Sequence, residues 1–215
     1  MADIINLWKF LADTCNKSQY FNPLFSWFVV VYTYYAVGKN AGAIWKYLFY
    51  VVTAGFIANV LALIKTYAFE SNFYIQYVKY MNCVETIFFG LNEWGFVFIN
   101  YKKISSCVNT LKSKFWHYLV YIFLGYVMFC RVMIAYYKVD EEYMKYTEKH
   151  MGLTHVDRTE QSTRFHAALY IPIGIIEFLF IMAVIIQYFK EKSGNIRKEL
   201  STLLHSTLFR MLISK

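Results

Sequence analysis

Proline, glycine and charged residues are all scarce in this sequence. Its 215 residues include two prolines and nine glycines, too few for a loop-rich architecture, and only 17% are charged. A typical soluble domain carries roughly a quarter charged residues. Apolar residues, in contrast, make up 58% of the chain and aromatic residues 21%. A soluble protein of this length could not bury so much apolar surface, so we expect lipid to be the main solvent.

The motifs of common catalytic and metal sites are also missing from the sequence. It contains no GxSxG, no HExxH and no glycine-rich phosphate loop. Its four cysteines form no CxxC pair and show no metal-type spacing. His150 and His155 lie in an acid-rich segment, but their spacing does not match a zinc helix and no third ligand is fixed. We therefore expect no catalytic residues, no metal and no cofactor.

A cleavable signal peptide is not evident at the N-terminus. Charged residues interrupt any apolar core of the required length within the first twenty residues. Four apolar residues instead recur at helical spacing there. These residues are Ile4, Leu7, Trp8 and Leu11. The segment 1–20 is therefore predicted to be amphipathic and to lie on the membrane surface.

Five long apolar stretches account for most of the remaining chain. They cover residues 18–38, 47–64, 80–101, 115–137 and 165–189. Each is close to the roughly 20 residues that a spanning helix needs, and none alternates apolar with polar residues as a membrane β-strand does. The predicted fold is an all-α integral membrane protein, a bundle of five transmembrane helices within 21–190. A further amphipathic helix at 195–215 either lies on the surface or begins a sixth membrane helix.

Basic residues in the connections predict the orientation of the bundle. The segments 38–46, 101–114 and 190–215 hold twelve Lys and Arg and two acids. The segments on the opposite side, 1–20, 65–79 and 138–164, hold nine basic and nine acidic residues. Basic residues in short loops remain cytoplasmic. We therefore expect the N-terminus outside and the C-terminus in the cytoplasm, without distinguishing the plasma membrane from an endomembrane.

Polar residues inside the apolar stretches are the candidate functional residues, because such groups are expensive in lipid. The proposed intramembrane polar core consists of Asn59, Glu85, Asn92, Glu93, Arg131 and Glu177. Glu85 and Arg131 are expected at similar depths and are predicted to pair. Glu93 or Glu177 is then expected to be protonated or to face water. Lys65, near the outer boundary, is expected only to extend its ammonium to the surface.

The predicted topology resembles the first five helices of a seven-helix receptor in architecture alone. The long outer connection has no cysteine and no acid-Arg-Tyr triplet ends the third helix, so we assign no family. A receptor-like, ligand-sensing protein is the leading hypothesis. The alternatives are a transporter or channel component that uses intramembrane carboxylates, and a membrane-embedded lipid-modifying enzyme. Expected partners are the lipid bilayer and either further copies of the chain or other membrane subunits. Nucleic acid is not expected, because the basic residues form no continuous stripe.

Overall fold

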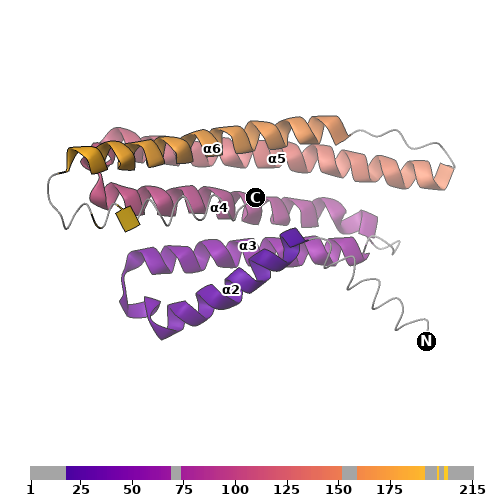
Figure 1. The fold of residues 1–215 in the computed structure, drawn as a ribbon. Helices are drawn as coiled ribbons and strands as arrows, with labels where there is room; N and C mark the ends of the chain where they lie inside the picture. The colour runs from indigo at the N-terminus through magenta and orange to yellow at the C-terminus, as the bar shows by residue number, and fades with distance from the viewer. Residues whose placement is uncertain (1–17, 69–73, 152–158, 192–197, 199–200, 203–215) are drawn as a thin grey trace. The chain divides into compact units, whose positions relative to one another are not determined.

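The chain is almost entirely helical in the residues that a computed structural model describes, which are 18–68, 74–151, 159–191, 198 and 201–202. Within these residues, five α-helices and two short 3-10 helices follow one another (Figure 1). They are α2 (Ser18–Ala36), η1 (Gly38–Asn40), α3 (Ala43–Ala68), α4 (Tyr74–Cys107), η2 (Asn109–Lys112), α5 (Lys114–Met151) and α6 (Thr159–Lys190). Nearly all of the predicted amphipathic segments, 1–20 and 195–215, lies outside the described residues.

Four of the described helices are longer than their apolar stretches, α4 and α5 most of all. α4 has 34 residues and α5 has 38, so most of the predicted outer connection 138–164 is helical up to Met151 and again from Thr159. This connection is therefore largely a continuation of α5 and α6. Charged residues mark the membrane boundary, but proline, glycine and capping residues end helices. The sequence KVDEEYMKYTEK that follows Tyr137 has none of these stop signals and is rich in good helix formers.

In the part of the chain that the structure describes, three helices are long and apolar enough to cross a membrane. These candidate spans are Ala43–Lys65, Lys114–Glu141 and Gln161–Lys190. The apolar part of α2, Leu24–Ala36, is shorter. α4 has the length, but glutamate and asparagine side chains lower its mean hydropathy, and it is not among the three. Length and composition thus support three of the five predicted spans.

The chain divides into two compact units. The first comprises residues 1–92 and 139–155, and the second comprises residues 93–138 and 156–215. α4 and α5 therefore each contribute one part to each unit. The two units are described separately below.

Aromatic side chains join α2 to α3 in the first unit. The Trp27 and Phe56 rings stack with their centroids 4.2 Å apart, and the Trp27 indole N–H donates to Thr53 Oγ1 at 3.2 Å. Nearer the connection through η1, Tyr34 stacks on Phe49 at 4.8 Å. Both pairs have favourable stacked geometry. The two helices consequently run side by side, as Figure 1 shows.

Small residues line the buried face of α3. Ala54, Ala58 and Ala62 recur every four residues, and Ala58 is completely buried. Gly55 is adjacent to this face, and a β-carbon there would lie only 2.6 Å from Nδ2 of Asn92. Small side chains allow the backbones of membrane helices to approach closely. Glycine at position 55 therefore leaves room for the Asn92 amide of α4.

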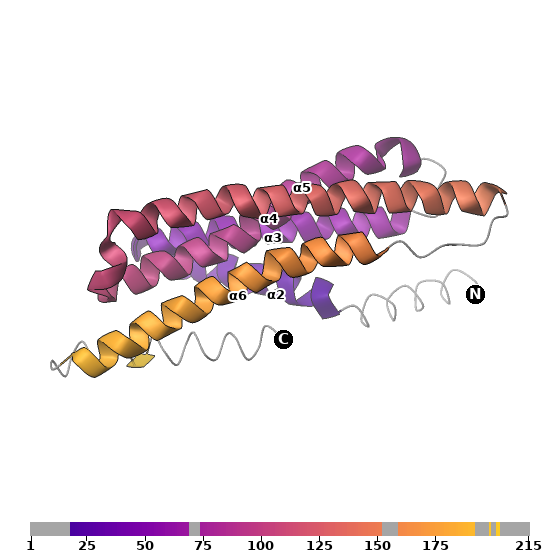
Figure 2. The same ribbon diagram turned by 90° about the horizontal axis from the view of Figure 1, so that it is seen from above.

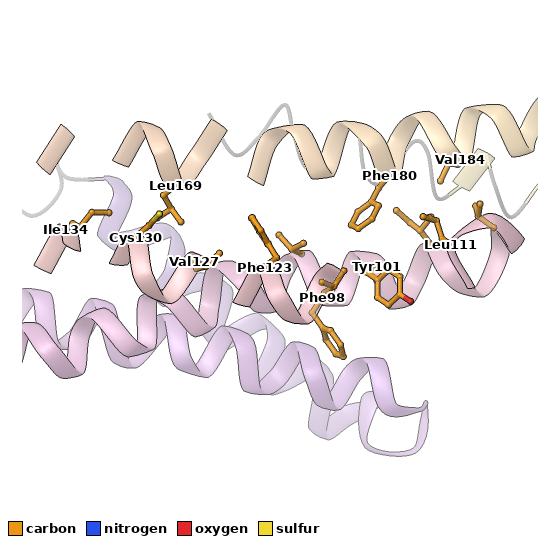
Figure 3. Close-up of a cluster of buried hydrophobic side chains, with 14 residues drawn as sticks. Phe98, Tyr101, Leu111, Phe123, Val127, Cys130, Ile134, Leu169, Phe180 and Val184 are labelled. Carbon is orange, nitrogen blue, oxygen red and sulfur yellow. The ribbon is translucent and has the colours of Figure 1, made fainter. Parts of the chain in front are cut away.

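The second unit has an apolar core between α4, α5 and α6. Its fourteen buried members include the residues labelled in Figure 3, among them Val127 and Leu169, which are completely buried. Val108 and Leu111, in the connection between α4 and α5, belong to the same core. α5 and α6 run alongside each other in Figure 1, whereas the view from above shows them crossing at an angle, close where α6 begins and apart where it ends (Figure 2). This core holds the polar site in place.

Pro172, inside α6, leaves a backbone carbonyl without its usual helical partner. Proline has no N–H, so the Ala168 carbonyl four residues earlier receives no intrahelical hydrogen bond. The hydroxyl of Tyr126 on α5 donates to this oxygen at 2.6 Å. An interhelical hydrogen bond thus replaces the one that the proline removes, as membrane proteins commonly require.

We expect Tyr126→Phe to lower the free energy of unfolding by about 1 kcal/mol, because the Ala168 carbonyl loses its donor. Pro172→Ala restores the helical N–H, so in that background the same Tyr126 substitution should have little effect. Melting curves of the four purified proteins in detergent measure both effects. Equal losses in the two backgrounds would contradict this role for Tyr126.

Candidate functional site

An ion pair joins α4 to α5 in the second unit. Arg131 Nε donates to Glu93 Oε2 at 2.8 Å, and Arg131 Nη2 donates to Glu93 Oε1. The pair is therefore bidentate, the strongest geometry available to arginine and a carboxylate. The side chains are only 9% and 14% exposed. Such a desolvated pair fixes two helices against one another, because separating the charges leaves both without a partner.

α6 adds aromatic side chains to this pair. Arg131 Nη2 also donates to the Tyr170 hydroxyl at 3.3 Å, so the guanidinium contacts both α4 and α6. One turn earlier on α6, the His166 ring stacks on Tyr170 with the centroids 6.0 Å apart and an angle of 12°. Glu93, Arg131, Tyr170 and His166 thus form a continuous chain of polar and aromatic groups.

A second polar level lies further along α4 and α6. Asn100 Nδ2 donates to Glu177 Oε1 at 3.0 Å. Asn100 follows Glu93 by seven residues, and Glu177 follows Tyr170 by seven residues. Because α4 and α6 run in the same direction, these equal steps place the second level about 10 Å beyond the first. We refer to Glu93, Arg131, Tyr170, Asn100 and Glu177 as the polar column.

The structure gives Glu85 and Arg131 other partners, so their predicted pairing was wrong. In the first unit, the Lys65 ammonium lies 3.1 Å from Glu85 Oε2 and donates to Asn82 Oδ1 at 2.6 Å. Lys65 and Glu85 side chains are 12% and 10% exposed. Lys65 therefore does more than extend to the surface. The predicted pairing failed because similar depth does not show which helices face one another, and Lys65 on α3 lies next to Glu85.

The two remaining predicted core residues also lie in the first unit. Asn59 is buried, and its amide donates to the Gly55 carbonyl of its own helix at 2.7 Å. Asn92 packs against Gly55, and its Oδ1 is buried without a hydrogen-bond partner among the described residues. The six predicted residues are thus divided, with Asn59, Glu85 and Asn92 in one unit and Glu93, Arg131 and Glu177 in the other.

Each of the three carboxyl groups contacts a different side chain. Glu85 lies beside Lys65, Glu93 pairs with Arg131, and Glu177 accepts a hydrogen bond from the Asn100 amide. A carboxyl group can keep a hydrogen bond with an amide in either protonation state, because the amide both donates and accepts.

A metal centre finds no support in the described part of the chain, where no group of three or more His, Cys, Asp and Glu side chains could hold an ion. His150 and His155, which motivated the enzyme alternative, fall where side chains are not described. Sequence reasoning missed Tyr170 and Tyr126, although Tyr170 lies seven residues before Glu177 on the same helix face. No protein-family model matches the sequence, and no curated protein and no solved structure matches the chain.

Proposed function

We propose that the chain is a multi-pass membrane protein that senses a ligand or an ion through its polar column. The observation that carries this proposal is the distribution of polarity in the second unit. Asn100 and Arg131 are buried, whereas Ile122, Phe129 and Phe178 are between 57% and 74% exposed. Polar groups inside and apolar groups outside are the arrangement that lipid favours. In this proposal all five helices span the membrane, with the N-terminus outside.

The two levels of the column have different roles in this proposal. The Glu93–Arg131 pair, braced by Tyr170, holds α4, α5 and α6 in one arrangement. Glu177, which accepts a hydrogen bond from the Asn100 amide, is the group that responds. A cation or proton that reaches Glu177 changes its interaction with Asn100 and hence the contact between α4 and α6. A ligand shifts a conformational equilibrium when it binds one state more tightly than the other.

Transport of protons or cations is the second candidate. The observation that favours it is the repetition of carboxylates at two levels of one column, Glu93 and Glu177, about 10 Å apart by helical rise. Carboxylates placed in succession along a bundle are typical of ion pathways in membrane proteins. The two candidates differ in whether an ion crosses the membrane or only binds.

We expect Glu177→Gln to abolish the pH response of the protein while preserving its fold. Glutamine keeps the hydrogen bond with Asn100 but cannot titrate. The wild-type protein in liposomes should show a pH-dependent change in tryptophan fluorescence, since Trp94 packs in the same unit. The same variant in liposomes loaded with a pH-sensitive dye tests proton flux, which separates transport from sensing.

Glu191→Gln, at the end of the same helix, is the matched control and should retain the wild-type transition. Melting temperature and gel-filtration profile report whether each variant folds. If Glu177→Gln retains the transition while His150→Ala and His155→Ala abolish it, the responsive site lies in the 138–164 segment and the enzyme alternative replaces this proposal.

A further inference from the structure

Five lysines lie at or near the same end of the second unit, where α4 ends, α5 begins and α6 ends. Figures 1 and 2 both show these three helix ends on the same side of the unit. The residues are Lys102, Lys103, Lys112, Lys114 and Lys190, here called the lysine cluster. The described acidic residue nearest to it in sequence is Glu191, which follows Lys190. This end of the unit therefore carries a strong positive charge.

The connection that bears much of this charge is fixed to the core. Val108 and Leu111 are each 1% exposed and belong to the apolar core, as Figure 3 shows for Leu111. Between them, the 3-10 helix Asn109–Lys112 begins, and Lys112 Nζ donates to Asn109 Oδ1 at 2.9 Å. Lys112 and Lys114, which follow Leu111 in the sequence, are consequently held on a segment that is anchored to the core.

Aromatic side chains border the cluster on the side of the apolar helices. Phe115 and Tyr118, one and four residues after Lys114, are 66% and 64% exposed. On α4, Lys102 Nζ lies 5.5 Å from the centre of the Phe98 ring. Exposed aromatic residues next to lysines are typical of the layer where lipid headgroups meet the hydrocarbon.

We propose that the lysine cluster binds the headgroups of anionic lipids. Its charge is complementary to phosphate, the exposed aromatic residues place it at headgroup depth, and the anchored connection holds it in position. The occupant is a lipid of the adjoining leaflet, with phosphatidylglycerol or phosphatidylserine as its chemical class. This inference rests on the proposed membrane location and is independent of the role of Glu177.

Native mass spectrometry of the purified full chain in detergent tests the proposal with phosphatidylglycerol and phosphatidylcholine as probes. We expect the dissociation constant for phosphatidylglycerol to be at least about tenfold lower than that for phosphatidylcholine. Lys112→Gln with Lys114→Gln should raise the former about tenfold or more, since each lysine near an anionic surface contributes about a factor of five.

Two matched variants separate charge at this site from charge in general. Lys145→Gln with Lys149→Gln removes the same charge near the far end of α5 and should leave phosphatidylglycerol binding unchanged. Lys112→Arg with Lys114→Arg keeps the charge and should retain binding. Equal affinity for the two lipids, or an equal loss in the Lys145 and Lys149 variant, overturns the proposal.

Further measurements cover misfolding, free phosphate and membrane location. If the Lys112 and Lys114 variant does not fold, wild-type protein in 0.5 M NaCl replaces it, and binding that does not weaken with salt overturns the proposal. Displacement of phosphatidylglycerol by millimolar inorganic phosphate would assign the cluster to soluble phosphate instead. A chain that carbonate washing removes from cell membranes contradicts the proposed function itself, whereas a membrane-retained chain without lipid preference contradicts this inference alone.

Discussion

Arg131→Met should lower the free energy of unfolding by about 3–5 kcal/mol, because it breaks a buried ion pair on one side. Methionine fills much of the volume of the arginine side chain, but it leaves the largely buried Glu93 carboxylate without its bidentate partner. It also removes the donor to the Tyr170 hydroxyl. Denaturation of the purified protein in mixed micelles with increasing sodium dodecyl sulfate measures the change.

The double substitution Arg131→Met with Glu93→Gln tests whether this loss comes from the unpaired charge. Replacing both charged partners removes the isolated carboxylate, so the double variant should be more stable than Arg131→Met alone. Pairing Arg131→Met with Glu85→Gln is the matched control and should give no such recovery, because Glu85 pairs with Lys65. Recovery with Glu85→Gln and not with Glu93→Gln would reverse our assignment.

Phe180→Ala should lower the free energy of unfolding by about 3–5 kcal/mol, because it opens a cavity in the core of the second unit. The Phe180 ring is 1% exposed and lies 6.2 Å from the centres of both the Tyr101 and the Trp116 rings. The cavity that truncation leaves would lie beside these two aromatic rings. The same denaturation assay measures this loss.

Phe178 provides a matched control on the same helix. It is the same residue type two positions earlier, but it is 57% exposed. In a membrane its ring contacts lipid, which fills the space after truncation, so Phe178→Ala should cost far less than Phe180→Ala. Similar losses for the two variants would contradict the assignment of one face of α6 to the core and the other to lipid.

The sequence predicted the helical class correctly, and the apolar stretches lie for the most part within the observed helices. Runs such as IIEFLFIMAVII cannot alternate between two faces, so a helix was the remaining structure. The helix ends were predicted less well, because charge marks where lipid ends but does not stop a helix. Hence α4 and α5 continue beyond the boundaries that Tyr101 and Tyr137 indicated.

The candidate site shows the same limit. The sequence pattern identified the charged residues, but the packing of the helices decides which of them pair. Isolated charges in apolar stretches identified Glu85, Glu93, Arg131 and Glu177, because each is expensive in lipid. Depth favoured Glu85 over Glu93 as the partner of Arg131, and that choice was wrong. The correct partner depends on which neighbours each part of α4 has, and the structure places Glu85 beside α3 and Glu93 beside α5.

In the proposed topology, α4 would insert poorly into the membrane by itself, because it carries two glutamates and a charged residue near the centre of a helix costs roughly 2.5–3.5 kcal/mol. Lys65 is synthesised before α4 and would neutralise Glu85 when α3 and α4 insert together. Arg131 lies 38 residues after Glu93, so the second glutamate would be paired only after α5 has been synthesised. Under this proposal, insertion of α4 would therefore depend first on α3 and then on α5.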